Sequence, residues 1–171
     1  MTFPKKTVKT ERLTLSPLEE SDLEDLIDIL ANENVSKTYM ICDLYTDADR
    51  KKLYDRLYRF IADSGSILYG IRKNGALIGF IHDMEIDRDS IEMGYVLSFE
   101  HWNNGYMTEA FKAMIKILFE CGFGSVIAGY FEENTASMRV MEKCGMSPMG
   151  KTEEVEYRGA VHKVFYREIR K

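Results

Sequence analysis

The sequence predicts an α+β domain in which helices flank a mixed, mostly antiparallel and twisted β-sheet. Two dipeptides, Asn74-Gly75 and Arg158-Gly159, separate strand-like segments and are typical of tight hairpin turns. One passage, 91–131, reads as strand, helix and strand, which provides a single parallel crossover. The predicted order is β-α-α-β-β-β-α-β-α-β-β, and this irregular order excludes a doubly wound parallel sheet.

The chain has 171 residues, so we expect a single domain over 1–171 that can bury a sizeable core. Its net charge of −5 disfavours nucleic acid as the main partner, because no excess positive field faces the phosphates. The N-terminal stretch 1–13 has no long apolar segment, so neither a signal peptide nor a membrane span is expected. We therefore expect a cytoplasmic protein.

Cysteine and histidine spacing predicts no metal site and no disulfide framework. Cys42, Cys121 and Cys144 are far apart, and no Cys-x-x-Cys pair occurs. The histidines His82, His101 and His162 are also scattered. Free thiols of this kind suit a reducing compartment.

In the N-terminal half, segment 8–18 alternates like an opening strand that stops at Pro17. Segment 21–33 predicts an amphipathic helix, with Ser21 and Glu24 at the spacing of a capping box. Its apolar face consists of Leu23, Leu26, Ile27 and Leu30.

A second helix is predicted to begin at Thr46, with the acidic residue Asp49 three positions on, at the spacing of a capping box. Its apolar stripe is Leu53, Tyr54, Leu57, Tyr58 and Ile61, which predicts core and cleft-wall contacts. The remaining predicted elements are strands at 66–73, 76–86 and 91–99, a helix at 105–121, a strand at 123–131, a helix at 134–143 closed at Gly145, and two strands within 150–170.

The corner "HWNNGYMTEA" (101–110) joins a strand to a helix and is polar. Gly105 allows the backbone to approach a bulky group, and the first amides of the following helix have no acceptor within the helix. Such amides, together with the helix dipole, make a site for phosphate or pyrophosphate. The alternative is an ordinary turn that contains a glycine. The corner is neither a Walker A loop nor Gly-x-Gly-x-x-Gly.

Three further polar residues suggest chemistry. Asn134 and Ser137 lie one helical turn apart, on the same side of the last helix. Glu92 stands in the strand before the corner, where its carboxylate can face a cleft. The structural alternatives are a helix N-cap for Asn134, a surface position for Ser137 and a solvated carboxylate for Glu92.

These residues belong to stretches that resemble the GNAT acetyltransferases. The stretches are "IEMGYVLSFEHWNNGYMTEA" (91–110) and "NTASMRVMEKCGM" (134–146). The branch typified by ribosomal-protein-alanine N-acetyltransferases is the most similar, and its first strand and helix also resemble "TERLTLSPLEESDLEDLIDILANENVSKTYM" (10–40). The resemblance covers nearly the whole chain.

The resemblance implies acetyl-coenzyme A as donor, with its pyrophosphate on the backbone amides of the corner. It also implies that the strand around 95–98 bulges and splays from the strand around 127–130, so that the pantetheine arm lies between them. An amide near Leu97 is expected to polarise the thioester carbonyl. The cofactor-binding residues implied are Tyr95, Val96, Leu97, Ser98, Trp102, Asn103, Asn104, Gly105, Tyr106, Met107, Thr108, Asn134 and Ser137.

The implied reaction is direct attack of a primary amine on the thioester, with Glu92 as general base and Ser137 as the acid for the leaving thiolate. The chain departs from the family pattern at three positions. Asn103 stands where glycine is common, Met107 where glycine or alanine is usual, and Met141 where many members carry a tyrosine acid. Asn103 and Met107 place cofactor affinity in question.

The acceptor amine is left open. The first two helices roof the acceptor site in this family, so Tyr39, Met40, Tyr45 and Tyr58 are the implied acceptor contacts. Trp102 either stacks on a ligand or anchors the corner. The acceptor is a protein N-terminus or side chain, or alternatively a small amine such as a polyamine or aminoglycoside. A third hypothesis is a non-catalytic acyl-coenzyme A binder. A homodimer through the C-terminal strands is possible; no membrane partner is expected.

Overall fold

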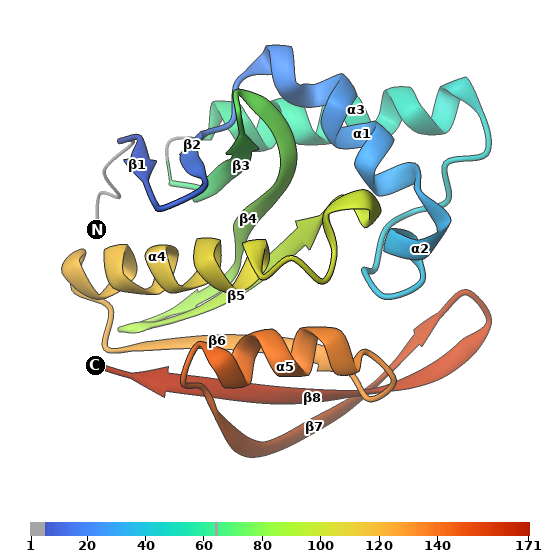
Figure 1. Cartoon of the computed structure of the whole chain (residues 1–171). Helices are drawn as coiled ribbons and strands as arrows, with labels where there is room; N and C mark the ends of the chain where they lie inside the picture. The colour runs from blue at the N-terminus through green and yellow to red at the C-terminus, as the bar shows by residue number, and fades with distance from the viewer. Residues whose placement is uncertain (1–5, 64) are drawn as a thin grey trace. The chain divides into compact units, whose positions relative to one another are not determined.

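The computed structural model describes residues 6–63 and 65–171 (Figure 1). The strands are β1 (Val8–Lys9), β2 (Thr14–Pro17), β3 (Leu68–Lys73), β4 (Ala76–Asp87), β5 (Ser90–Leu97), β6 (Ser125–Phe131), β7 (Ser147–Tyr157) and β8 (Ala160–Arg170). The α-helices are α1 (Leu23–Ala31), α2 (Glu33–Ser36), α3 (Asp47–Ala62), α4 (Tyr106–Glu120) and α5 (Thr135–Lys143), with 3-10 turns η1 (Glu20–Asp22) and η2 (Phe99–His101). Among these helices, none has the length and apolar character needed to cross a bilayer.

The strands follow the order β1-β2-β3-β4-β5-β6-β8-β7. β5 and β6 pair in parallel, whereas β1–β2, β2–β3, β3–β4, β6–β8 and β7–β8 pair antiparallel. The predicted mixed, mostly antiparallel sheet flanked by helices is therefore confirmed.

The chain forms two compact units. The first, called the N-terminal unit, extends to His82 and includes Tyr95–Tyr106; the second, called the C-terminal unit, consists of Asp83–Gly94 and Met107–Lys171. Strands β4 and β5 each contribute residues to both units. The prediction of one domain over 1–171 stays a prediction.

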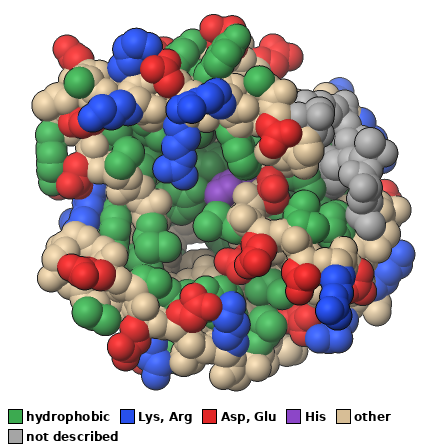
Figure 2. Space-filling view, turned by 180° about the vertical axis from the view of Figure 1, so that it is seen from behind, with side chains coloured by type: hydrophobic (Ala, Val, Ile, Leu, Met, Phe, Trp, Pro, Cys, Tyr) green, Lys and Arg blue, Asp and Glu red, His purple; other side chains and the backbone are tan. Residues whose placement is uncertain are grey.

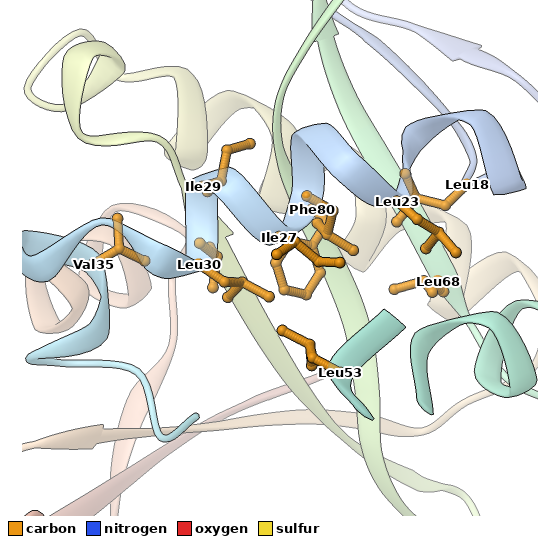
Figure 3. Packing of buried hydrophobic residues seen from close by; sticks show 11 residues of the cluster. Leu18, Leu23, Ile27, Ile29, Leu30, Val35, Leu53, Leu68 and Phe80 are labelled. Atoms are coloured by element: carbon orange, nitrogen blue, oxygen red, sulfur yellow. The ribbon is translucent and has the colours of Figure 1, made fainter. Parts of the chain in front are cut away.

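The core of the N-terminal unit forms between α1, α3 and the strands. The predicted apolar face of α1 is buried completely, since Leu23, Leu26, Ile27 and Leu30 are each at most 2% exposed. Figure 3 shows Ile27 of α1 directed toward Phe80 of β4, with Leu53 of α3 close by. Burying aliphatic side chains in this way contributes roughly 1.5–3 kcal/mol each.

Helix starts follow the predicted capping logic in one case and not in the other. Thr46 accepts from the Asp49 amide at 3.2 Å, and the Thr46 amide donates to the Asp49 carboxylate at 3.1 Å, so the predicted capping box is confirmed. The predicted box of Ser21 and Glu24 is wrong. The chain instead turns at Glu19, whose amide donates to Asp22 Oδ2 at 2.9 Å.

Asp22, rather than the predicted pair of Ser21 and Glu24, sets the helix start because a residue distant in the sequence binds its carboxylate. Arg72 of β3 donates to Asp22 Oδ2 at 2.6 Å, and this carboxylate is only 8% exposed. The helix start is thereby tied to a strand fifty positions away in sequence. Spacing along the helix alone carries no signal of such a partner.

Two local features of the first half differ from the sequence prediction. The opening strand predicted over 8–18 is a small hairpin, because Thr10 donates its amide to the Leu13 carbonyl at 2.9 Å and separates β1 from β2. Pro17 does end β2, as predicted. The short helix α2 was not predicted; Asn32 caps it by accepting from the Asn34 amide at 2.9 Å.

The predicted hairpin turns are confirmed. Asn74 and Gly75 have φ values of 51° and 88°, and Arg158 and Gly159 have φ values of 52° and 74°. Two successive left-handed residues match the twist of the flanking antiparallel strands. Each dipeptide therefore fixes the register of the strands on either side.

In the C-terminal unit, β6 pairs along its whole length with the C-terminal part of β8, from Ser125 opposite Arg170 to Phe131 opposite Val164. On its other side β8 pairs with β7, whose register shifts between Pro148 and Thr152. This β-bulge contains Gly150, which has a φ value of 73°. β7 is the last strand of the sheet order.

Acidic and basic side chains are interspersed over the face that Figure 2 shows. This distribution is consistent with the modest net charge of −5. It resembles the mixed surface typical of ordinary globular proteins.

The close approach of Gly79 to the backbone of β5 yields a stability prediction. A Cβ added at Gly79 would lie 2.3 Å from the Val96 carbonyl oxygen and 3.0 Å from the Leu97 Cα, both of them backbone atoms. We expect Gly79→Ala to lower the free energy of unfolding by about 1–3 kcal/mol or more, because the backbone must shift. Urea unfolding measures the change.

Gly65→Ala is the matched control, because the one contact of its added Cβ among the described residues is the Asp63 carboxylate, at 3.5 Å. This variant should match the wild type within about 0.5 kcal/mol. Equal stability of both variants would contradict the assigned contact between β4 and β5.

Candidate functional site

The corner between β5 and α4 has the backbone that an anion site requires. α4 begins at Tyr106, and the preceding residue is Gly105, which has a φ value of 75° and no side chain to cap the helix. The side-chain amide of the neighbouring Asn104 turns back toward the preceding chain, where its Nδ2 donates to the Trp102 carbonyl at 2.8 Å. The first amides of α4 therefore lie at an end marked by glycine.

Asn103 explains one departure from the family pattern. Its φ value is 60°, in the left-handed region, where glycine is favoured and asparagine is the best-tolerated residue after it. A glycine is common at this position in the proteins that the sequence resembles. Asn103 thus meets the same backbone demand with a side chain added.

Trp102 anchors the corner. Its indole Nε1 donates to the Leu97 carbonyl at 2.8 Å, and its ring lies 5.2 Å from that of Phe99. The half-buried ring packs against the core of the N-terminal unit. Of the two roles considered from the sequence, the anchoring role is the one that the structure supports.

Two cations that the sequence reasoning missed lie at the same corner. The Arg12 guanidinium lies 4.6 Å from the Tyr106 ring centroid, and Lys73 Nζ lies 4.8 Å from it. Arg12 also donates to the Asn104 carbonyl at 3.0 Å. These residues come from β3 and from the turn before β2, so only the fold brings them to the helix start.

The end of β5 is rigidly held. Val96, Leu97 and Ser98 are each at most 9% exposed, and the Ser98 amide donates to the Ile78 carbonyl at 2.8 Å. Ser98 Oγ and His101 Nδ1 are 2.7 Å apart. The backbone expected to face the thioester is therefore fixed from two sides, while Tyr95 is half-buried.

Met107 and Thr108 continue α4 in the C-terminal unit. The Met107 side chain is 6% exposed, so its bulk is accommodated in the protein interior. Thr108 is half-buried, and its carbonyl accepts a 3.7 Å bond from the Cys144 thiol. The large Met107 side chain therefore packs in the interior and forms no exposed obstruction.

Asn134 and Ser137 are brought together, as predicted. Asn134 is the N-cap of α5, and its Oδ1 accepts from the Ser137 amide at 3.1 Å. The helix-cap role considered for Asn134 is therefore present. It leaves the Nδ2 group as the part of this side chain that can serve a ligand contact, which stays a prediction.

Glu92 lies half-buried on β5 in the C-terminal unit. Burial raises the pKa of its carboxyl, nearby Lys151 opposes this, and Glu85 and Glu153 add to it. A carboxylate whose pKa is raised toward neutrality is suited to accepting a proton. Neither Lys151 nor Glu153 was predicted to lie near Glu92.

The four predicted acceptor contacts differ in exposure. Met40, Tyr45 and Tyr58 are 50%, 82% and 46% exposed, whereas Tyr39 is half-buried. The Tyr39 hydroxyl lies 2.6 Å from His82 Nε2, and burial raises the pKa of Tyr39 above its ordinary range. Tyr58 was also predicted to join the apolar stripe of α3, but its exposure places it outside the core.

The three thiols differ in exposure. Cys42 is exposed, Cys121 is half-buried and Cys144 is buried, and none of the three forms a disulfide. Burial raises the pKa of Cys144 to about 11, which keeps it protonated at neutral pH. Among residues 6–63 and 65–171, no three His, Cys, Asp or Glu side chains gather as metal ligands.

Known proteins share this architecture. A family model described as "Acetyltransferase (GNAT) domain" matches residues 12–147. The uncharacterized N-acetyltransferase YoaA of Bacillus subtilis is 24% identical over 155 residues, which cover 88% of each chain. The crystal structure of an acetyltransferase (GNAT family) from Bacillus anthracis superposes with a TM-score of 0.81, at 26% identity, over 96% of this chain and 98% of that one.

A more distant structure, RimL, a ribosomal L7/L12 alpha-N-protein acetyltransferase in complex with coenzyme A, superposes with a TM-score of 0.82. Its identity is 17%, with 96% of this chain and 98% of that chain covered. At this identity the likeness concerns the fold.

The left-handed backbone at Asn103 yields a prediction for the corner. We expect Asn103→Gly to leave the free energy of unfolding within about 0.5 kcal/mol of the wild type, and Asn103→Val to lower it by about 1–2 kcal/mol or more, since a β-branched residue is strained at positive φ. Urea unfolding of both variants measures the difference. Equal stability of the two variants would show that the corner does not hold this backbone.

Proposed function

The chain belongs to the GNAT acetyltransferase family, and from this premise we propose that it transfers the acetyl group of acetyl-coenzyme A to a primary amine by direct attack. The observation that carries the proposal is the start of α4, where Gly105 precedes the helix and Arg12 and Lys73 lie against Tyr106. Helix amides and two cations at one corner form a site for an anionic donor.

The donor is proposed to place its pyrophosphate on the backbone of residues 102–108. An anion there interacts favourably with the positive end of the α4 dipole. Arg12 and Lys73 add positive charge within reach of the same turn, as their contacts with Tyr106 indicate. Acetyl-coenzyme A carries the activated acetyl group as a thioester, and the protein supplies orientation and proton transfer.

Glu92 is proposed as the base. An amine acceptor is mostly protonated at neutral pH, since the pKa of a lysine side chain is about 10.4. Glu92, directly or through a water, takes the proton, the amine nitrogen forms its bond to the acetyl carbon, and the carbon–sulfur bond breaks. Ser137 gives a proton to the departing thiolate and regains one from the attacking nitrogen, which loses its second proton as the product forms, and the backbone amide near Leu97 binds the oxyanion of the tetrahedral intermediate.

The acceptor proposed first is a protein N-terminus or side chain. The fold shared with RimL, which is described as an alpha-N-protein acetyltransferase, supports this class. A small cationic amine is the second candidate, because Glu85 and Glu153 add negative charge around Glu92. Met40, Tyr45 and Tyr58 are proposed contacts for either class, since each has a large exposed fraction.

The donor proposal predicts binding of coenzyme A compounds. Calorimetric titration should detect acetyl-coenzyme A and desulfo-coenzyme A but not NADH. We expect Gly105→Asp to weaken acetyl-coenzyme A binding at least about tenfold, because the new carboxylate competes for the α4 amides and repels the pyrophosphate. Gly75→Asp is the matched control: Gly75 also has a positive φ value, but it lies in the β3–β4 turn.

Folded wild-type protein that fails to bind either coenzyme A compound would refute the donor proposal. Equal loss of binding in both aspartate variants would refute the role of the corner.

The base proposal predicts a pH dependence. We expect Glu92→Gln to lower turnover by about 10²–10⁴-fold. In the wild type, activity should fall as pH decreases through the raised pKa of Glu92, because protonation removes the base. This acidic limb should disappear in the variant, as pH–rate profiles of both proteins will show.

The stability of Glu92→Gln distinguishes loss of the base from misfolding of the variant. Because the folded-state pKa of Glu92 is raised, its contribution to stability is present at low pH and is lost as pH rises through that pKa. Glu92→Gln should therefore be at least as stable as wild type at pH 7. Glu156→Gln, a change on exposed β7, is the control for activity. An unchanged acidic limb in Glu92→Gln would rule out the assignment.

A further inference from the structure

The strand register of the C-terminal unit places Glu92 on a face shared with β8. Glu92 pairs with Ile127 of β6, and Ile127 pairs with Glu168 of β8. Paired residues point to the same side of a sheet, as do residues two apart in a strand. Tyr166, two residues before Glu168, therefore shares the face of Glu92.

β7 completes this face. Glu153 pairs with Val164, which lies two residues before Tyr166 on β8. The side chains of Tyr166 and Glu153 meet: the Tyr166 hydroxyl donates to Glu153 Oε2 at 3.0 Å. Glu92, Tyr166 and Glu153 thus come from three strands and face the same side.

Gly129 makes room for the tyrosine ring. It pairs with Tyr166 across β6 and β8, and a Cβ added there would lie 3.0 Å from Tyr166 Cε1 and 3.3 Å from Val164 Cγ1. A larger residue at Gly129 would force the ring away. The absent side chain therefore allows the ring to lie over β6.

The bulge in β7 directs a primary ammonium onto this face. Lys151 lies within the register shift, and its Nζ is 2.9 Å from Glu153 Oε1 and 4.1 Å from the centroid of the Tyr166 ring. A carboxylate beside an aromatic face is a typical environment for a bound alkylammonium. The face thus already holds one such group.

Charges from three strands act on Lys151. Glu153 raises its pKa first, through their hydrogen bond, and Glu92 of β5 and Glu85 of β4 also raise it. Lys151 is therefore the cation among three carboxylates. One bound ammonium leaves this group of side chains with an excess of negative charge.

We propose that this face binds the acceptor's primary ammonium between Glu153, the Tyr166 ring and Glu92, and that Lys151 occupies the same place until an acceptor displaces it. The inference rests on the proposed function, since it gives the acceptor of that reaction a site. It makes Lys151 an internal competitor. The contact is suited to displacement, because the side chains of Lys151 and Glu153 are 47% and 46% exposed and such surface ion pairs are weak.

The apolar side chains beside the ammonium define the acceptor class. Phe131 and Val164 are buried there together with Tyr166, and Ile127, Val155 and Tyr157 pack against them. By register and alternation these residues share the face of Glu92 and Glu153. The acceptor inferred is a primary ammonium on an apolar or aromatic group, such as an N-terminal residue with an apolar side chain.

The probe for this site is 2-phenylethylammonium, with 2-phenylethanol as its uncharged counterpart. Binding is measured by amide chemical-shift titration of the full chain without acetyl-coenzyme A. We expect Lys151→Met and Lys151→Gln to bind the ammonium about three- to tenfold more tightly than wild type, as loss of a weak internal competitor requires. Adding Glu153→Gln to Lys151→Met should reverse the gain.

Two matched controls lie on β7 and β8. Lys163→Met makes the same chemical change as Lys151→Met, but on the opposite side of the sheet, where Lys163 Nζ lies 5.0 Å from the centroid of the Phe165 ring. Glu154→Gln makes the same chemical change as Glu153→Gln at the next position of β7. Both should bind the probe as wild type does. The proposal is overturned if the Lys151 variants bind no more tightly than wild type, or if 2-phenylethanol binds equally well.

The two binding measurements distinguish failure of this inference from failure of the donor proposal. If acetyl-coenzyme A binds by calorimetry but the Lys151 variants gain no affinity for the ammonium, the site proposal fails and the donor proposal stands. If the ammonium result holds and acetyl-coenzyme A does not bind, the donor proposal fails instead.

Discussion

The parallel pairing of β5 with β6 is the constraint on which the rest of the structure depends. Parallel neighbours need a crossover, so α4 must begin where β5 ends, and the chain must turn within residues 98–105. The turn uses left-handed backbone at Asn103 and Gly105, which leaves the helix start without a side-chain cap from the residue before it. The register between β5 and β6 runs only from Ser90 to Glu92 opposite Ser125 to Ile127. One topological demand thus sets both the start of α4, where the anion site is proposed, and the place of the candidate base.

Local chemistry made much of this fold predictable from the sequence. The Asn74-Gly75 turn and the Thr46–Asp49 capping box each depend on residues within four positions of one another, and both were predicted correctly. The helix that follows Gly105 was predicted for the same reason. Where a distant partner decides, prediction failed: Asp22 sets the first helix start because Arg72 binds it. The short helix α2 was not predicted, because a single helical turn has no periodicity to detect.

The same distinction applies to the candidate site. Asn134 and Ser137 were found together because one helical turn joins them, and their hydrogen bond confirms that proximity. Lys151, Glu153 and Tyr166 lie far along the chain from Glu92, and only the order of four strands brings them within electrostatic reach of it. The pairing that brings them there also includes a register shift in β7, which a pattern of alternating residues does not reveal. Electrostatics around a strand carboxylate is therefore a property of the sheet rather than of the motif.

The bulge in β7 has a second consequence, for association between molecules. β7 is an edge of the sheet order, and a long regular edge offers unpaired amides and carbonyls to strands of other chains. Pro148 lacks an amide hydrogen, Gly150 bends the strand, and Lys151 adds charge at the same place. These are the means by which natural sheets avoid edge-to-edge aggregation. Residues 148–151 therefore combine a missing hydrogen-bond donor, a kink and a cation. Shortening this bulge would expose a straight strand edge that is open to cross-β growth.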